Sequence, residues 1–201
     1  TLIHYYFDPI GDKWCVGTTG TAEAVEMVSS RDKLTGERKD YDFSLTDLFY
    51  KTCEEQNVTL PTSKNYTYMF ELATDANIVV NKYESSRLVL LGIRCLYGEY
   101  SEHDQDMLDG AARIFNCARP KQYFFESEKE MLDSLKNVKY GDDNFEGYVI
   151  VDDKFNRLKV KSNTYIIFSQ FNGDLESKWR LVDVVLTNEI EEVSSTFPAL
   201  K

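Results

Sequence analysis

The chain has 201 residues, of which 42% are hydrophobic and 13% aromatic, enough to bury the core of one substantial domain. Its formal net charge of −11 at pH 7 argues against nonspecific nucleic-acid binding by the whole surface and restricts any nucleic acid to a local basic groove. The longest apolar runs are far too short to cross a bilayer, and no basic segment followed by an apolar one opens the sequence, which predicts neither a membrane segment nor a secretory signal.

Five runs have the alternation or the β-branched and aromatic content of strands, and they cover residues 1–7, 13–16, 66–72, 78–83 and 87–95. Between the second and third of these, residues 21–30 are expected to form a helix. Ser44, with Asp47 three residues later and an apolar pattern at helical spacing beyond it, predicts the capped start of another helix.

The second half of the chain adds helices and a hairpin. Helices are expected over residues 101–116, 126–138, 165–171 and 175–188. The acidic run 102–106 contains metal-ligand types, but we assign it to a helix start, where carboxylates favour the positive end of the helix dipole. Strands gathered around helical insertions and followed by terminal helices predict an α+β fold with a mainly antiparallel sheet.

Cysteine and histidine are sparse. The cysteines lie far apart in the sequence, which excludes a zinc knuckle and a Cys-x-x-Cys redox motif, and two histidines cannot form a histidine-rich metal site. Scattered cysteines are most simply buried thiols in a reducing compartment, so we expect a cytoplasmic protein. The cysteines are Cys15, Cys53, Cys95 and Cys117.

The most informative stretch is 145–162, where two strands are joined by a polar turn. Arg157, Lys159 and Lys161 share one face of the second strand because side chains alternate along it. If the two turn residues are Asp153 and Lys154, Glu146 lies opposite Lys161. This arrangement predicts a polyphosphate held by two ammonium groups, with a carboxylate nearby for a sugar hydroxyl or a metal ion. The alternative is an edge strand whose lysines only discourage aggregation.

A second candidate lies in the aromatic strand 66–72, which ends in Glu71. A carboxylate that interrupts an apolar pattern needs a partner or a ligand if it is buried. The alternative is a glutamate at a strand end beside solvent, which on this segment alone is the simpler interpretation.

Taken together, these segments match a known family in their residues and in their order along the chain. The pair of motifs Glu-Gly-Tyr-Val and Lys-Val-Lys is fairly specific to it, and the remaining segments support the match because they occur in the same order. From Thr1 to Tyr165 the chain resembles the bacteriophage-type ATP-dependent RNA ligases that repair broken tRNA, within the covalent nucleotidyltransferase superfamily. The resembling segments are 14–21, 70–72, 78–83, 88–94, 146–149 and 158–165.

The resemblance implies a fold. Residues 1–165 would be a nucleotidyltransferase (ATP-grasp-like) domain with mainly antiparallel sheets and flanking helices, and residues 166–201 the beginning of a helical C-terminal region. It also implies ATP and Mg²⁺ as cofactors, and it implies RNA ends, of tRNA or other structured RNA, as partners. The reaction would proceed through a lysyl-AMP and an adenylylated RNA.

The resemblance assigns roles to five residues. Glu71 would contact the nucleotide ribose, and Glu146 would place the metal or the nucleophilic lysine. Lys159 and Lys161 would hold the ATP phosphates and stabilise charge on the α-phosphate. Arg94 matches a basic position of the family that would bind the nucleotide.

The chain also departs from the family pattern. Threonine replaces the usual lysine in the segment 18–21, and Ile78 replaces an arginine. The nucleophile motif Lys-x-Asp-Gly is absent from the 201 residues. Since the strand that follows this motif in the family corresponds to the segment beginning at Thr1, we expect a fragment cut just downstream of the nucleophile and inactive alone.

Three other functions remain open. The chain could be a degenerate nucleotidyltransferase-like domain that binds RNA ends without catalysis, which the acidic balance and the lost basic residues favour. It could also belong to a DNA ligase or a guanylyltransferase of the same superfamily. A general α+β domain with coincidental motifs is the last alternative.

Overall fold

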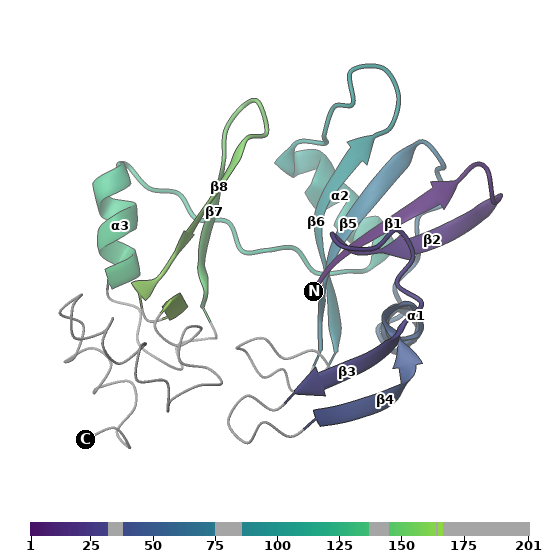
Figure 1. The fold of residues 1–201 in the computed structure, drawn as a ribbon. Coiled ribbons are helices and arrows are strands. Elements are labelled where there is room, and N and C mark those ends of the chain that lie inside the picture. The colour runs from purple at the N-terminus through teal and green to yellow at the C-terminus, as the bar shows by residue number, and fades with distance from the viewer. Residues whose placement is uncertain (32–37, 75–85, 137–144, 164, 167–201) are drawn as a thin grey trace. The chain divides into compact units, whose positions relative to one another are not determined.

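The computed structural model describes residues 1–31, 38–74, 86–136, 145–163 and 165–166. The described part is mixed α and β, with three antiparallel sheets and three helices, in agreement with the expected combination of helices and antiparallel sheets (Figure 1). The chain divides after Gln122 into two compact units, which are described separately. Unit 1 holds most of the chain before that point, and unit 2 contains the elements after it.

Unit 1 is built on a four-stranded antiparallel sheet with the strand order β2-β1-β5-β6. The strands are β1 (Leu2–Asp8), β2 (Lys13–Gly17), β5 (Tyr66–Ala73) and β6 (Arg87–Cys95). Buried and half-buried residues alternate strictly along β1, as expected of a strand with one face on the core. All four strands therefore confirm the sequence prediction to within one or two residues at each end.

The core of unit 1 lies on one face of this sheet. Its centre is aromatic: Tyr5 of β1 stacks on Trp14 of β2, with ring centroids 4.6 Å apart, and also on Phe49, at 5.6 Å. Phe49 belongs to α1 (Leu45–Glu55) and is fully buried, as is Phe70 of β5. Stacking of Phe49 on Tyr5 thus connects α1 to the sheet.

Both helices of unit 1 begin at side-chain caps, of which the sequence predicted the one at Ser44. The Ser44 side chain accepts a hydrogen bond from the Asp47 amide at 3.1 Å, and the Asp47 carboxylate accepts one from the Ser44 amide at 2.8 Å, which completes a capping box. Helix α2 (Gln105–Phe115) begins at Asp104, whose carboxylate accepts from the Met107 amide at 2.8 Å. The acidic run 102–106 thus lies at a helix start, as the sequence predicts, and Asp104 is its cap.

The prediction of a helix over residues 21–30 is wrong. Residues 27–31 form β3 (Met27–Arg31), which pairs with β4 (Arg38–Ser44) in a two-stranded sheet. The Ala24 amide donates to Val16 O at 2.8 Å, and Ala24 O accepts from the Thr46 amide at 3.1 Å. Because these backbone groups are bonded to β2 and to the start of α1, they are not available for intrahelical hydrogen bonds.

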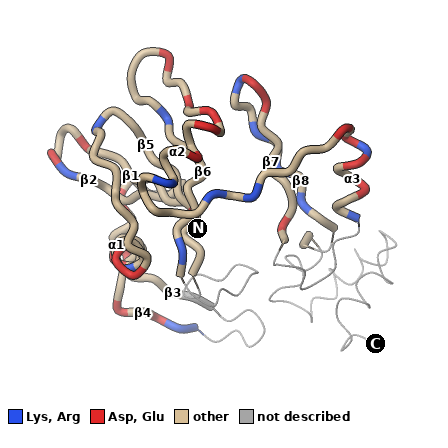
Figure 2. The backbone as a smooth tube through the Cα atoms, turned by 180° about the vertical axis from the view of Figure 1, so that it is seen from behind, with Lys and Arg blue, Asp and Glu red and all other residues tan. Residues whose placement is uncertain are grey.

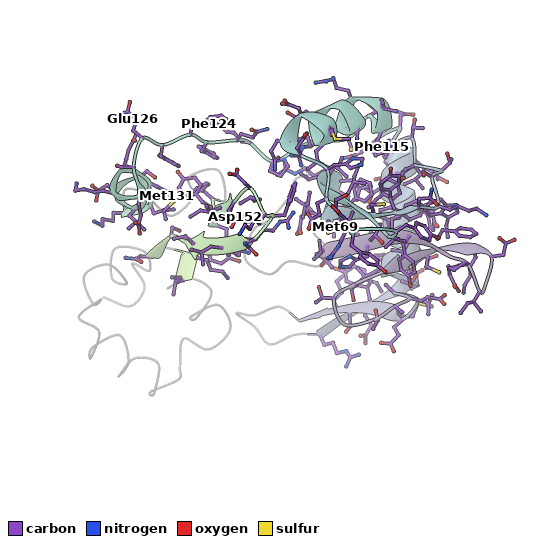
Figure 3. All side chains as sticks on the ribbon, turned by 90° about the horizontal axis from the view of Figure 1, so that it is seen from above. Met69, Phe115, Phe124, Glu126, Met131 and Asp152 are labelled. Atoms are coloured by element: carbon purple, nitrogen blue, oxygen red, sulfur yellow. The ribbon has the colours of Figure 1, made fainter. Side chains whose placement is uncertain are left out.

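In unit 2, aromatic rings gather around the first strand of a hairpin, which also contacts a helix. Its described elements are α3 (Glu128–Lys136), β7 (Gly147–Val151) and β8 (Arg157–Lys161). Tyr148 of β7 makes edge contacts with the rings of three other aromatic residues, and its hydroxyl lies 3.1 Å from Ser134 Oγ on α3. Met131 of α3, labelled in Figure 3, is also buried. The rings around Tyr148 are Tyr123, Phe125 and Phe145.

Several expectations fall partly or wholly outside the described residues. The strand expected over 78–83 lies outside them, as do the helix over 175–188 and most of the segment 166–201. Of the helix expected over 165–171, residues 165 and 166 are described and helical, with the Ile166 amide donating to Ser162 O at 3.0 Å. Among the described residues, we find no helix long and apolar enough to cross a membrane.

Candidate nucleotide site

The β7–β8 hairpin positions the candidate catalytic residues. Gly147 pairs with Lys161, and Val149 with Lys159. The register assumed from the sequence, with Glu146 opposite Lys161, is therefore wrong by one residue. The cause is the turn, which spans residues 152–156 instead of being a two-residue connection.

Asp152 determines the shape of that turn. Its Oδ1 accepts hydrogen bonds from the amides of Lys154 at 2.9 Å and Asn156 at 2.8 Å, and its Oδ2 accepts from Asn156 Nδ2 at 2.7 Å. Phe155 takes a positive φ of 60° within it. The hydrogen bonds from Asn156, followed by that from Lys154, lower the pKa of Asp152 below its usual range. A turn of five residues between the paired residues Val151 and Arg157 thus changes the strand register from the one that a two-residue turn would give.

Glu146 nevertheless contacts both lysines. Its Oε1 atom lies 2.7 Å from Lys159 Nζ and 3.2 Å from Lys161 Nζ. In a regular ladder Glu146 would share a face with Ser162, whose amide donates to Glu146 O at 2.9 Å, and not with the lysines. Gly147, with a φ of +149°, interrupts the alternation between Glu146 and β7. Sequence reasoning missed this role of Gly147, although a glycine at the start of a strand is a signal for such an irregularity.

The three side chains form a partly solvated charge cluster. The exposed fractions are 31% for Glu146, 52% for Lys159 and 38% for Lys161. Burial raises the pKa of Glu146, but the hydrogen bonds and charges of the two lysines outweigh it, so that the pKa lies below its ordinary value. Glu146 is consequently an ionised carboxylate at neutral pH. The Lys161 ammonium also lies 4.8 Å from the centre of the Tyr165 ring, a cation–π contact.

The predicted nucleotide residues of unit 1 lie on β5 and β6. Glu71 Oε1 is 2.6 Å from the Thr1 ammonium, and Arg94 Nε donates to Tyr100 O at 3.2 Å. Thr67 pairs with Arg94, which places Arg94 four residue positions along β5 from Glu71, or about 13 Å. The structure therefore separates Glu71 from Arg94 within unit 1. Glu146 and the two lysines belong to unit 2.

The threonine segment that departs from the family pattern forms a closed turn. The Thr18 amide donates to Thr21 O at 2.8 Å, and Thr18 Oγ1 accepts from the amides of Gly20 and Thr21, both at 3.2 Å. These contacts show the hydroxyl of Thr18 engaged with its own loop. Ile78, the other departure, lies outside the described residues.

Basic and acidic positions are distributed along both units, and the Lys and Arg positions of β8 are blue in Figure 2. Among the described residues, no group of three or more His, Cys, Asp or Glu side chains is arranged to hold a metal ion.

Comparison with known proteins identifies the family. A family model described as RNA ligase matches residues 18–165, which include both strands of the hairpin. The RNA ligase of Rhodothermus phage RM378 is 23% identical over 226 aligned residues, which cover 96% of this chain and 49% of the phage protein. The chain thus spans about half the length of this curated relative. It belongs to the RNA ligase family.

Proposed function

We propose that this chain is the nucleotidyltransferase part of an ATP-dependent RNA ligase, which joins RNA 5′-phosphate and 3′-hydroxyl ends through lysyl-AMP and adenylylated RNA. The observation that carries the proposal is the contact of one carboxylate, Glu146, with both Lys159 and Lys161 in a chain of the RNA ligase family. A carboxylate between two ammonium groups keeps these cations in place before a phosphate arrives.

The two lysines suit a phosphoryl-transfer site. In the proposed first step a lysine amine attacks the α-phosphorus of ATP, the bond to the bridging oxygen breaks, and pyrophosphate leaves with the electron pair. The nucleophile loses its proton in this step. Lys159 and Lys161 would stabilise the negative charge that develops on the α-phosphate oxygens and on the leaving group.

The same cations would serve the two later steps. An oxygen of the RNA 5′-phosphate displaces the lysine from AMP, and a 3′-hydroxyl oxygen then displaces AMP as the new phosphodiester forms. Negative charge again develops on phosphate oxygens in both displacements, so that compact point charges such as Lys159 and Lys161 remain useful. We propose tRNA or another structured RNA as the substrate.

In unit 1, Glu71 would accept hydrogen bonds from the ribose hydroxyls of the nucleotide. Its present partner is the Thr1 ammonium. In a longer protein that nitrogen is a neutral amide with a single hydrogen, which leaves more acceptor capacity on Glu71 for a ribose. Arg94 is proposed as a weaker nucleotide contact, because its guanidinium is already bonded to the Tyr100 carbonyl.

Mg²⁺ fits this site as an ion shared with phosphates. Mg²⁺ commonly takes one or two protein carboxylates and completes its shell with phosphate oxygens and water, and Glu146 provides one ionised carboxylate. When bound, the ion would supply positive charge to the phosphates. Both printed lysine contacts of Glu146 are made by its Oε1 atom, at 2.7 and 3.2 Å, so that the ion would bind beside these two ammonium groups.

The test is intact-mass spectrometry after incubation with ATP and Mg²⁺, on this chain and on the same chain extended through its upstream reading frame. We expect one AMP added to the extended protein and none to this chain, since the chain has no Lys-x-Asp-Gly. No adduct on either protein would contradict the proposal and favour a domain that binds RNA ends without catalysis.

Substrate competition separates RNA ligase from the other members of the superfamily. The complete protein should seal a nick or break whose ends are RNA, and should form its adduct from ATP in preference to GTP. Preference for DNA ends or for GTP would contradict the RNA ligase assignment.

We also propose the cytoplasm as the compartment of the protein, because free thiols such as those of its four cysteines persist in a reducing environment.

A further inference from the structure

One imidazole on the main sheet of unit 1 faces away from the core. Along β1 the residues Ile3 and Tyr5 are buried in the core, so His4, which lies between them, is on the opposite face of the sheet. On this face His4 pairs with Gly17 of β2 and with Met69 of β5, which is labelled in Figure 3. Gly17 adds no side chain beside the ring.

The His4 imidazole is half-buried but open to a ligand. Within the described residues, His4 makes no hydrogen bond, ion pair or ring contact. In the same part of the chain, Nδ1 of His103 is the one side-chain nitrogen or oxygen that is both buried and unpaired. Both ring nitrogens of His4 therefore reach the solvent and can meet a ligand.

Two other basic side chains of this face are already engaged. Lys13, at the start of β2, lies 2.7 Å from Glu23 Oε2. Arg94 of β6 donates from Nε to Tyr100 O at 3.2 Å. His4 is thus a basic group of this face whose hydrogen-bonding atoms are still available.

His4 also lies near Glu71, the proposed ribose contact. Leu2 pairs with Glu71 two residues along the same strands on which His4 pairs with Met69. The Cβ atoms of such diagonal neighbours on one face are about 7–8 Å apart. The Glu71 carboxylate is 39% exposed. An imidazole and a carboxylate at this separation can contact two groups of one nucleotide.

We propose that the His4 imidazole donates a hydrogen bond to a phosphate oxygen of a substrate, either ATP or the 5′ end of the RNA. This inference rests on the proposed function, which brings a nucleotide to Glu71. The ribose hydroxyls and the phosphate of a nucleotide are separated by few bonds, so a donor beside the ribose contact is within reach of the phosphate. A hydrogen bond from an imidazole to a charged phosphate oxygen is charge-assisted. In a chain whose net charge is −11, such donors have to be supplied locally.

Binding of three nucleosides and nucleotides by the complete protein tests the role of the phosphate. Adenosine, AMP and ATP are titrated calorimetrically without Mg²⁺, so that no AMP is transferred. The variant His4→Leu keeps an apolar side chain on the sheet but removes the donor. If the phosphate belongs to ATP, His4→Leu should weaken ATP binding about tenfold or more and leave adenosine binding unchanged, because a hydrogen bond to a charged group is lost. Equal weakening for adenosine would show a contact to the base or the ribose and would overturn the proposal.

A second pair of ligands tests the RNA end as the source of the phosphate. The probes are a fluorescein-labelled single-stranded RNA with a 5′-phosphate and the same RNA with a 5′-hydroxyl, both followed by anisotropy. If the phosphate belongs to the RNA, His4→Leu should weaken binding of the 5′-phosphorylated RNA alone and leave ATP binding unchanged. Unchanged affinities for ATP and for the 5′-phosphorylated RNA would overturn the proposal, as would equal losses for the two RNAs.

Two further variants serve as controls. His4→Gln keeps an N–H donor and should recover part of the affinity that His4→Leu loses. Lys51→Gln removes a positive charge from α1, which packs on the core face of the sheet, at a side chain that is 67% exposed and 3.8 Å from Glu55. It should leave all the affinities unchanged. A loss as large as that of His4→Leu would show an effect of net charge and would overturn the proposal.

This proposal and the proposed function fail in different ways. If the complete unchanged protein forms no AMP adduct with ATP and Mg²⁺, the ligase mechanism is wrong. The two binding series still decide whether His4 contacts a phosphate, because they are measured without AMP transfer. Circular dichroism of each variant verifies that the fold is retained.

Discussion

Gly147 lies directly opposite Lys161 in the β7–β8 ladder, with so little space between the backbones that a side chain does not fit. A Cβ atom added to Gly147 would lie 2.7 Å from Lys161 Cα and closer still to Val160 O. Together with its φ of +149°, this contact makes glycine the residue that the position requires. The same residue turns the chain so that Glu146 reaches the lysines.

Replacing Gly147 with alanine should therefore damage both the hairpin and the charge cluster. We expect a loss of unfolding free energy of about 2 kcal/mol, since a strained backbone position costs roughly 1–3 kcal/mol. The AMP adduct of the complete protein should fall at least about tenfold, because Glu146 no longer meets the lysines. Denaturant unfolding and intact-mass spectrometry measure the two effects.

Gly20→Ala is the control for this substitution. No heavy atom lies within 4 Å of a Cβ built on Gly20, and the residue has no positive φ. Its stability should stay within about 0.5 kcal/mol of the unchanged protein. Equal losses for the two alanine variants would show that the close approach at Gly147 has no energetic consequence.

The charge of Glu146 predicts a pH dependence. Its pKa in the folded chain lies below the ordinary value, so the ion pairs contribute stability that is present above the unfolded pKa of about 4.3 and is lost as pH falls through the lower, folded pKa. Between neutral pH and about pH 5, the contribution should be constant. Acid unfolding of the protein and of Glu146→Gln, followed by circular dichroism, measures it.

In Glu146→Gln the carboxylate is absent, so the difference in stability between the two proteins should shrink as the pH falls below about 4.3. A difference that grows toward acid pH would contradict the sign. Glu146→Gln should also slow AMP-adduct formation by about 100-fold or more if the carboxylate places the reacting groups.

The sequence predicted well the elements whose residues satisfy local rules. The alternation of β1 and the capping pattern at Ser44 specify structure within a few residues, and both are confirmed. Residues 21–30 failed because distant partners decide them: the Ala24 backbone bonds to Val16 and Thr46. A single sequence contains no direct signal for such contacts.

The candidate site was predictable in part for the same reason. Period-two alternation correctly places Arg157, Lys159 and Lys161 on one face. The contact of Glu146 with the lysines depends on the conformation of Gly147 and on the length of the turn. The turn length was not predictable, because the polar residues of this turn are compatible with several lengths. The roles of Glu71 and Arg94 came from family resemblance and remain predictions, since their partners in this structure are Thr1 and Tyr100.

Asp152→Ala tests whether the turn controls the site from a distance. The variant removes the acceptor of the Lys154 and Asn156 amides. Both amides should exchange hydrogen faster, because a solvent-exposed turn that loses its side-chain acceptors opens more often. AMP-adduct formation by the complete protein should also fall, because the turn holds the start of β8, the strand that carries both lysines.

Native-state hydrogen exchange resolved by residue measures the amide effect. Asp153→Ala is the control, since Asp153 belongs to the same turn and none of the three turn hydrogen bonds described at Asp152 involves it. Unchanged protection of the two amides in Asp152→Ala would contradict the proposed role of the turn.

Ser44→Ala should destabilise unit 1 through the start of α1. The substitution removes the hydroxyl that accepts from the Asp47 amide at 3.1 Å and donates to the Asp47 carboxylate at 2.7 Å. Loss of a helix N-cap costs about 1 kcal/mol. Ser44→Thr should restore most of the stability, because threonine keeps a hydroxyl that can both accept and donate. Thermal unfolding compares the variants, and a Ser44→Thr protein no more stable than Ser44→Ala would argue against the cap as the cause.

Arg119 fixes α2 to the edge of the main sheet of unit 1. Its Nε donates to Asp109 Oδ1 at 2.9 Å, its Nη2 to Gln105 Oε1 at 2.5 Å, and its Nη1 to Leu90 O on β6 at 2.5 Å. The side chain is only 13% exposed. Arg119→Met keeps much of the buried length but removes the donors, and should cost about 2–3 kcal/mol because Asp109 and the Leu90 carbonyl lose a charged partner.

Arg119→Lys should recover only part of this loss, since one ammonium group cannot reproduce the fork that reaches a helix and a strand at once. Arg113→Met, on the exposed side of α2, removes the same charge without this contact, and should cost at most about 1 kcal/mol through the helix dipole. Urea denaturation ranks the three variants. If Arg113→Met were as damaging as Arg119→Met, the charge of α2 and not the connection to β6 would account for the stability of this layer.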